Sequence, residues 1–158
     1  MTTISNAFLT KVQLDSLETT AHLAKKIAPV LEAGDILLLR GTLGVGKTTF
    51  ARDLIQAYFK DDDLLVQSPT FTLCQVYDGS LSKSSIWHFD FYRLVHSEEI
   101  FEVGYEEAQA GGIIVIEWPE KMGGYCPTTA LELVFSLERE KRMVQLYSDL
   151  DKWQKVFT

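Results

Sequence analysis

One eight-residue segment, residues 41–48, constrains this 158-residue chain more than any other feature, and we call it the glycine loop. It has the spacing G-x-x-x-x-G-K-[ST], in which glycines let successive backbone N–H groups face one oxyanion. The wholly apolar run at residues 36–39 before it predicts a strand covered on both faces, and residues 48–59 after it read as a helix. Strand, loop and helix in this order predict a phosphate-binding P-loop in an α/β protein.

The rest of the chain predicts the elements around this unit. Residues 113–116 form a second wholly apolar strand, and alternating residues near 131–135 and 143–147 indicate an antiparallel hairpin. Asp15 and Glu18 fit a capping box for the first helix. The other expected elements are helices at 17–32, 97–102, 105–110 and 149–156 and strands at 71–77 and 85–89. We expect one domain, residues 1–158, folded as a three-layer P-loop NTPase-like sandwich with a central parallel sheet and antiparallel additions.

Charge and composition exclude some functions. Lys and Arg number 15 against 22 Asp and Glu, a net charge of -7, and neither half of the chain is basic. Direct binding to nucleic acid phosphates is therefore disfavoured, and a role on nucleic acid would act through another protein. Cys74 and Cys126 lie far apart and outside any metal-ligand spacing, which indicates free thiols in a reducing compartment. Residues 1–6 lack a basic and apolar leader, and no apolar run reaches about 20 residues, so we expect a cytoplasmic protein.

Certain residues of the motif and of the strand ends carry the expected chemistry. Lys47 would place its charge on the β and γ phosphates, and Thr48 would place its hydroxyl on Mg²⁺. A P-loop enzyme also needs a carboxylate at the end of a neighbouring strand, and both Asp90 and Glu117 qualify. Glu117 is the better candidate because it ends the more apolar strand, although either acid is also compatible with an ordinary strand end. The expected cofactors are ATP or ADP with Mg²⁺.

Four further side chains leave alternatives open. Thr70, or Ser68 beside it, would touch phosphate or Mg²⁺ when ATP is bound, or would simply belong to a proline-containing strand entry. Arg93 would reach phosphate oxygens or pair with Asp90. His88 is compatible with a metal site, but a lone histidine beside a tryptophan is more typical of a hydrogen-bonded core residue, and we favour the second interpretation.

The identity of the base is indicated by an absence. The chain contains no N-K-x-D motif, which would read guanine, so adenine or weak base selection is favoured. Adenine usually needs an apolar or aromatic wall. We expect this wall either near Thr10, in the segment 9–11, or at Trp153, which is alternatively a core anchor of the final helix.

Four segments in this order resemble the bacterial TsaE (also called YjeE) family: residues 41–49, S-P-T-F-T-L at 68–73, H-F-D-F-Y-R-L at 88–94 and I-E-W-P-E-K at 116–121. The resemblance implies an ATPase that assists threonylcarbamoyl transfer to the adenosine beside the anticodon of certain tRNAs. It implies TsaB and TsaD as protein partners, with tRNA reached through them. It places Asp90 and Glu117 on Mg²⁺ or water, makes the loop around Thr70 a switch, and puts Trp118 near the nucleotide. The expected nucleotide contacts are Gly41, Thr42, Leu43, Gly44, Val45, Gly46, Lys47, Thr48, Thr49, Thr10, Trp118 and Trp153.

Two other functions remain open at this point. A P-loop small-molecule kinase would need an arginine-bearing lid, and the chain has only five arginines with no basic lid segment. A nucleotide-dependent adaptor without essential catalysis would use nucleotide to order a binding surface, with the acidic region 98–107 as its docking face.

Overall fold

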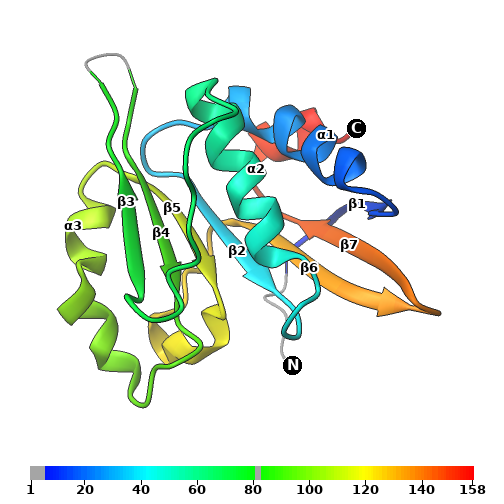
Figure 1. The fold of residues 1–158 in the computed structure, drawn as a ribbon. Helices are drawn as coiled ribbons and strands as arrows, with labels where there is room; N and C mark the ends of the chain where they lie inside the picture. The colour runs from blue at the N-terminus through cyan, green and yellow to red at the C-terminus, as the bar shows by residue number, and fades with distance from the viewer. Residues whose placement is uncertain (1–5, 81–82) are drawn as a thin grey trace.

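The sheet is the centre of the structure, a computed structural model that describes residues 6–80 and 83–158 (Figure 1). The described residues form one seven-stranded sheet with the order β1-β7-β6-β2-β5-β4-β3. Its central strand β2 runs parallel to β5 and β6, β4 runs parallel to β5, and the outer pairings are antiparallel. The strands are β1 (Phe8–Gln13), β2 (Ile36–Arg40), β3 (Cys74–Tyr77), β4 (Ile86–Asp90), β5 (Ile113–Glu117), β6 (Leu131–Glu138) and β7 (Lys141–Tyr147).

Both faces of the sheet are buried, which explains the apolar strands. Leu37 and Leu39 of β2 pack into one core with α1 (Leu17–Ile27) and α2 (Lys47–Phe59), which lie side by side in Figure 1. Leu38 points to a second core on the opposite face. That core is covered by the helix α3 (Tyr105–Gln109) and by the 3₁₀ segments η2 (Ser97–Val103) and η3 (Pro119–Tyr125). The sheet is thus the middle of three layers, and the expected fold class is confirmed.

The start of the chain differs from expectation. The first helix begins after Ser16, whose hydroxyl accepts from the Thr19 N–H. The capping box is therefore formed by Ser16 and Thr19, each one residue after the predicted Asp15 and Glu18. The helix ends at Ile27 and passes into a 3₁₀ turn, η1 (Ala28–Val30), because Pro29 has no backbone N–H with which to continue it. Strand β1 was not expected. It is a half-exposed edge strand, in which the alternation of apolar and polar residues is weak.

Other boundaries also shift. The predicted strand 71–77 is shorter, because pairing with β4 starts only at Cys74. The stretch 97–102 is a 3₁₀ helix, and η3 after β5 was not expected. The hairpin of β6 and β7 is confirmed, and the last helix, α4, is Asp151–Val156.

Two expectations based on composition can be compared with the described residues. Cys74 and Cys126 are free thiols, and burial raises the pKa of Cys74 to about 12, so it is not a reactive thiolate. None of the helices within residues 6–80 and 83–158 is long and apolar enough to cross a membrane. The expectation that the chain lacks a leader sequence was based on residues 1–6, and residues 1–5 lie outside the described residues.

Candidate functional site

The glycine loop joins the end of β2 to the start of α2, as predicted. Gly41 has a φ of 144°, and a Cβ there would lie 2.8 Å from the carbonyl oxygen of Phe135, so only glycine fits against β6. Gly46 has a φ of 114° and directly precedes α2. These two residues turn the backbone so that the loop closes over the N-terminus of a 13-residue helix. A helix N-terminus of this kind attracts anions through its free N–H groups and its dipole.

Two carboxylates lie beside this loop because of the strand register. Asp90 and Glu117 end β4 and β5 and are direct partners across the parallel pair, and Leu39 of β2 is the next partner of Glu117. Their exposed fractions are 3% and 2%. Buried carboxylates are costly unless hydrogen bonds or a cation compensate their charge. The carboxyl ends of the parallel strands therefore bring both predicted acids to the same place.

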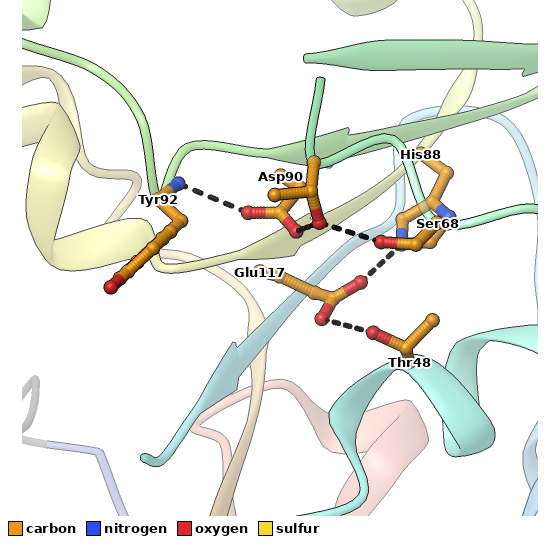
Figure 2. A network of polar contacts seen from close by, with 7 residues as sticks. Thr48, Ser68, His88, Asp90, Tyr92 and Glu117 are labelled. Atoms are coloured by element: carbon orange, nitrogen blue, oxygen red, sulfur yellow. Dashed lines mark hydrogen bonds and ion pairs between the residues drawn. The ribbon is translucent and has the colours of Figure 1, made fainter. Parts of the chain in front are cut away.

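Glu117 has a hydrogen-bond partner at each oxygen (Figure 2). The Thr48 hydroxyl donates to Oε1 over 2.8 Å, and Nε2 of His88 lies 2.7 Å from Oε2. Thr48 comes from the first turn of α2 and His88 from the middle of β4, so three elements meet at one carboxylate. His88 is fully buried, which agrees with the core interpretation of this histidine.

Asp90 links the site to the loop before β3. The Thr70 hydroxyl donates to Oδ2 over 2.9 Å, and Ser68 Oγ lies 2.7 Å from Thr70 Oγ1 (Figure 2). The Tyr92 N–H donates to Oδ1 over 3.0 Å. Burial raises the pKa of Asp90, while the Tyr92 N–H and the Thr70 hydroxyl oppose this rise. The position of Thr70 thus depends on the same carboxylate that we predicted as a ligand for Mg²⁺ or water.

Lys47 has an exposed fraction of only 4%. Its ammonium donates to the carbonyl oxygen of Gly41 and lies 3.6 Å from the centre of the Trp118 ring. Trp118 has a φ of 60°, a left-handed conformation that is uncommon for a bulky residue, and its ring lies 4.9 Å from that of Tyr92. Burial lowers the pKa of Lys47, while the nearby carboxylates, Glu117 first among them, oppose this decrease. The lysine, the tryptophan and both acids therefore form one polar cluster.

Two cavities adjoin each other at the glycine loop. The smaller, of about 170 Å³, is lined by Leu43, Gly44, Gly46, Lys47, Thr48, Thr49, Thr70, Asp90, Glu117, Trp118 and Arg142. The larger, of about 510 Å³, shares Gly46, Thr49 and Arg142 with it and extends along Leu14 and Ser16. The sequence did not predict Arg142 as a site residue, because a single charged residue near a hairpin turn matches no binding motif.

The structure does not bring every predicted residue to this site. Trp153 is not a base wall but the core anchor that was its alternative interpretation, because its side chain is 1% exposed and lies in the same core as residues of α1 and α2. Thr10 lines a third cavity, which includes no residue of the glycine loop. Leu43 and Val45 do reach the site: Leu43 is 65% exposed and lines the smaller cavity, and Val45 is 2% exposed and lines the larger one. The guanidinium of Arg93 stacks 4.3 Å from the Phe71 ring, so neither alternative considered for Arg93 is the observed contact.

The side-chain oxygen atoms around the two carboxylates are of the kind that Mg²⁺ prefers as ligands. Thr48, Thr70, Asp90 and Glu117 offer hard oxygen atoms, and no described group of three or more His, Cys, Asp or Glu side chains could hold a metal. Mg²⁺ usually keeps several waters and combines one or two carboxylates with substrate phosphates instead of filling a protein cage. Two adjacent carboxylates with a hydroxyl beside the glycine loop could serve as a partial site of that kind.

Comparison with known proteins identifies relatives over most of the chain. Residues 14–144 match the family described as "Threonylcarbamoyl adenosine biosynthesis protein TsaE". A protein of Rickettsia conorii named "tRNA threonylcarbamoyladenosine biosynthesis protein TsaE" is 41% identical over 137 residues, which cover 86% of this chain and 77% of the relative. A protein of Aquifex aeolicus with the same name is 36% identical over 88% of this chain and 96% of its own.

One solved structure is similar to the fold as a whole. The crystal structure of Bacillus subtilus YdiB superposes with a TM-score of 0.69 and covers 93% of this chain and 90% of its own. The two sequences are 23% identical, so this likeness concerns the fold alone.

Proposed function

The chain belongs to the TsaE family of threonylcarbamoyl adenosine biosynthesis proteins, and we propose that it is a Mg²⁺-dependent ATPase that assists this tRNA modification. One observation carries the proposal. The hydroxyl that follows the motif lysine, on Thr48, donates to the buried carboxylate of Glu117 beside the glycine loop. A hydroxyl and a carboxylate in this relation are what phosphoryl-transfer sites use to hold Mg²⁺.

Phosphate binding belongs to the glycine loop. Its N–H groups and the N-terminus of α2 bind the phosphate oxygens, and the Lys47 ammonium leaves Trp118 to pair with them. Thr48, Glu117 and Asp90 would hold Mg²⁺, which supplies charge neutralisation on the phosphates when it is bound.

Hydrolysis needs a water held in line with the bond that breaks. Asp90 and Glu117 are the two carboxylates of the phosphate cavity that can orient it. Because the Thr70 hydroxyl is bonded to Asp90, a change at Asp90 when nucleotide binds moves the loop that carries Thr70. This coupling supports the switch role for that loop.

The nucleoside has room in the larger cavity. Its volume of about 510 Å³ lies in the range of small-molecule sites, and it begins where the phosphate cavity ends. Leu14 gives this cavity an apolar wall, and Arg142 lies at the junction of the two cavities. We place the base and ribose there, in place of the Thr10 and Trp153 expectations.

Action through protein partners of the TsaB–TsaD type completes the proposal. Leu43, which lines the phosphate cavity, is 65% exposed, and Phe71, which follows the lining residue Thr70 in the chain, is 80% exposed. Exposed apolar groups gathered at one place favour a protein contact. The net charge of -7 favours reaching tRNA through such partners.

The primary experiment measures nucleotide binding by calorimetry and phosphate release by a coupled assay, with and without Mg²⁺. Glu117→Gln should still bind ADP but hydrolyse ATP about 100-fold more slowly, because a positioned carboxylate is lost. Glu138→Gln is the matched control, since Glu138 pairs with Lys11 and lines neither cavity. A wild-type protein that binds neither ATP nor ADP in the presence of Mg²⁺ would sink the proposal.

The same preparations separate the alternatives. Phosphate transfer from ATP to a metabolite instead of water would identify a kinase. Normal tRNA modification in cells that carry a non-hydrolysing Glu117→Gln protein would identify an adaptor.

A second experiment addresses the partners. Phe71→Ser should weaken stimulation of ATP hydrolysis by a TsaB–TsaD pair while leaving the basal rate within about twofold, because Phe71 lies outside both cavities. Phe8→Ser is the control, because Phe8 is also exposed but lies on the opposite edge of the sheet. Equal stimulation of both variants would contradict a partner surface around Phe71.

A further inference from the structure

We infer that His88 is a positioning residue that holds the Glu117 carboxylate against Thr48, an inference that rests on the proposed ATPase function and deepens it. None of the motif roles assigned above includes this histidine. Its place in the fold, its hydrogen bond and its burial carry the inference.

The strand register explains how His88 reaches Glu117. His88 is paired with Val115 on the neighbouring strand, and Glu117 lies two residues further along, on the same face of the sheet as Val115. Nε2 lies 2.7 Å from Oε2 of Glu117, and the two side chains are 0% and 2% exposed. No solvent competes for this contact.

The hydrogens of the imidazole follow from its surroundings. An ionised Glu117 can only accept, so Nε2 carries the hydrogen. Nδ1 is buried and has no partner among the described residues. His88 therefore directs one N–H to one oxygen of Glu117, while Thr48 occupies the other oxygen.

The contact matters because Glu117 has a competing partner. Lys47 and Glu117 line the same cavity, and the Glu117 charge opposes the decrease that burial causes in the pKa of Lys47. Without His88, Oε2 becomes a buried oxygen with no hydrogen bond, and the flexible glutamate gains by turning toward the Lys47 ammonium. That pairing would remove both the lysine from phosphate and the carboxylate from Thr48. Mutation of a residue that hydrogen-bonds to a metal-ligating carboxylate typically lowers metal affinity or activity by about 10–100-fold.

Three substitutions separate positioning from packing. A glutamine amide reaches about as far from the backbone as Nε2, whereas an asparagine amide reaches only as far as Nδ1. His88→Gln should therefore retain the donor to Glu117, while His88→Asn and His88→Leu lose it. His22→Leu is the matched control, because His22 is exposed on α1 and lines neither cavity of the site.

The measurements are the ATP hydrolysis rate at saturating substrate, its Mg²⁺ dependence, and ADP affinity without Mg²⁺. We expect His88→Asn and His88→Leu to lose about 10-fold or more in rate, to need more Mg²⁺, and to bind ADP more weakly without Mg²⁺, because Glu117 then holds the Lys47 ammonium. His88→Gln should recover most of the rate. If folded His88→Asn hydrolyses ATP like the wild type, or if His88→Gln is no better than His88→Asn, the inference is overturned.

A crystal structure of His88→Asn makes the test independent of hydrolysis. Glu117 should leave Thr48 in this variant and keep its place in His88→Gln. An unchanged Glu117 in His88→Asn overturns the inference whatever the rates. A wild-type protein that binds nucleotide but never hydrolyses it overturns the proposed ATPase instead, and the Glu117 position then decides the positioning role.

Discussion

The ammonium of Lys47 lies 3.6 Å from the centre of the Trp118 ring, so the motif lysine makes a cation–π contact inside its own site. Such contacts contribute about 2 kcal/mol or more when water is excluded, as it is for a lysine that is 4% exposed. We propose the same ammonium as a phosphate ligand. Phosphate and the Trp118 ring therefore compete for one charge.

This competition predicts an optical signal. Titration with ADP should change the intrinsic fluorescence of the wild-type protein as Lys47 leaves the indole. Trp118→Phe should abolish the change while calorimetry still detects binding. Trp87→Phe should keep it, because Trp87 stacks on Phe89 in the second core. A change that persists in Trp118→Phe would contradict the competition.

Asp90→Asn should stabilise the protein without nucleotide while reducing hydrolysis. Burial raises the pKa of Asp90 above its unfolded value, so its ionisation favours unfolding, and native stability falls as pH rises through that raised pKa. Asparagine removes this cost and can still accept from the Tyr92 N–H and donate to Thr70. We expect a melting temperature about 2–4 °C higher at pH 7.

The pH dependence of that gain provides its check. The difference in melting temperature between Asp90→Asn and the wild type should shrink as pH falls through the raised pKa and reach its minimum well below 3.8, where Asp90 is protonated in both the folded and the unfolded state. Asp62→Asn, in the exposed turn after α2, should show no such gain. A pH-independent gain would assign the effect to something other than the buried charge.

Arg142 should contribute to nucleotide affinity. It is the only arginine among the described residues that line either cavity at the glycine loop, and it lines both. We expect Arg142→Ala to weaken ADP binding by about 10-fold, the effect of one charge-assisted hydrogen bond of about 1.4 kcal/mol. Arg139→Ala removes the same charge from the same hairpin at a position that lines neither cavity. Equal losses of ADP affinity in the two variants would indicate that Arg142 acts only by long-range electrostatic attraction.

The buried ion pair of Arg40 and Glu132 should matter for the fold. Their side chains are 3% and 0% exposed, and Arg40 directly precedes the glycine loop. Glu132→Ala should lower the free energy of unfolding by about 3–5 kcal/mol, because it leaves a buried guanidinium without its counter-charge. The double variant Arg40→Met/Glu132→Leu should recover most of this loss.

Denaturant unfolding measures both variants. Glu138→Ala is the comparison, because it breaks the exposed pair with Lys11 and should cost at most about 1 kcal/mol. If Glu132→Ala costs no more than Glu138→Ala, burial of the ion pair does not control its contribution.

Local pattern was sufficient for much of the architecture. The apolar runs that became β2 and β5 are covered on both faces, and the glycines before α2 adopt the backbone that the motif requires. Strand β1 was missed because its pairing with β7 joins opposite ends of the chain and leaves one side exposed. A half-exposed edge strand has no strong period of its own.

The sequence by itself determined the glycine loop, the two wholly apolar strands and the acids that end β4 and β5, because spacing and periodicity are properties of neighbouring residues. Only the tertiary structure decided which groups meet. The parallel register puts Asp90 opposite Glu117, and two residues of offset bring His88 to the second carboxylate oxygen. The fold also buries Trp153 in the core and brings Arg142 to the loop, because packing between distant segments sets which side chains face a cavity.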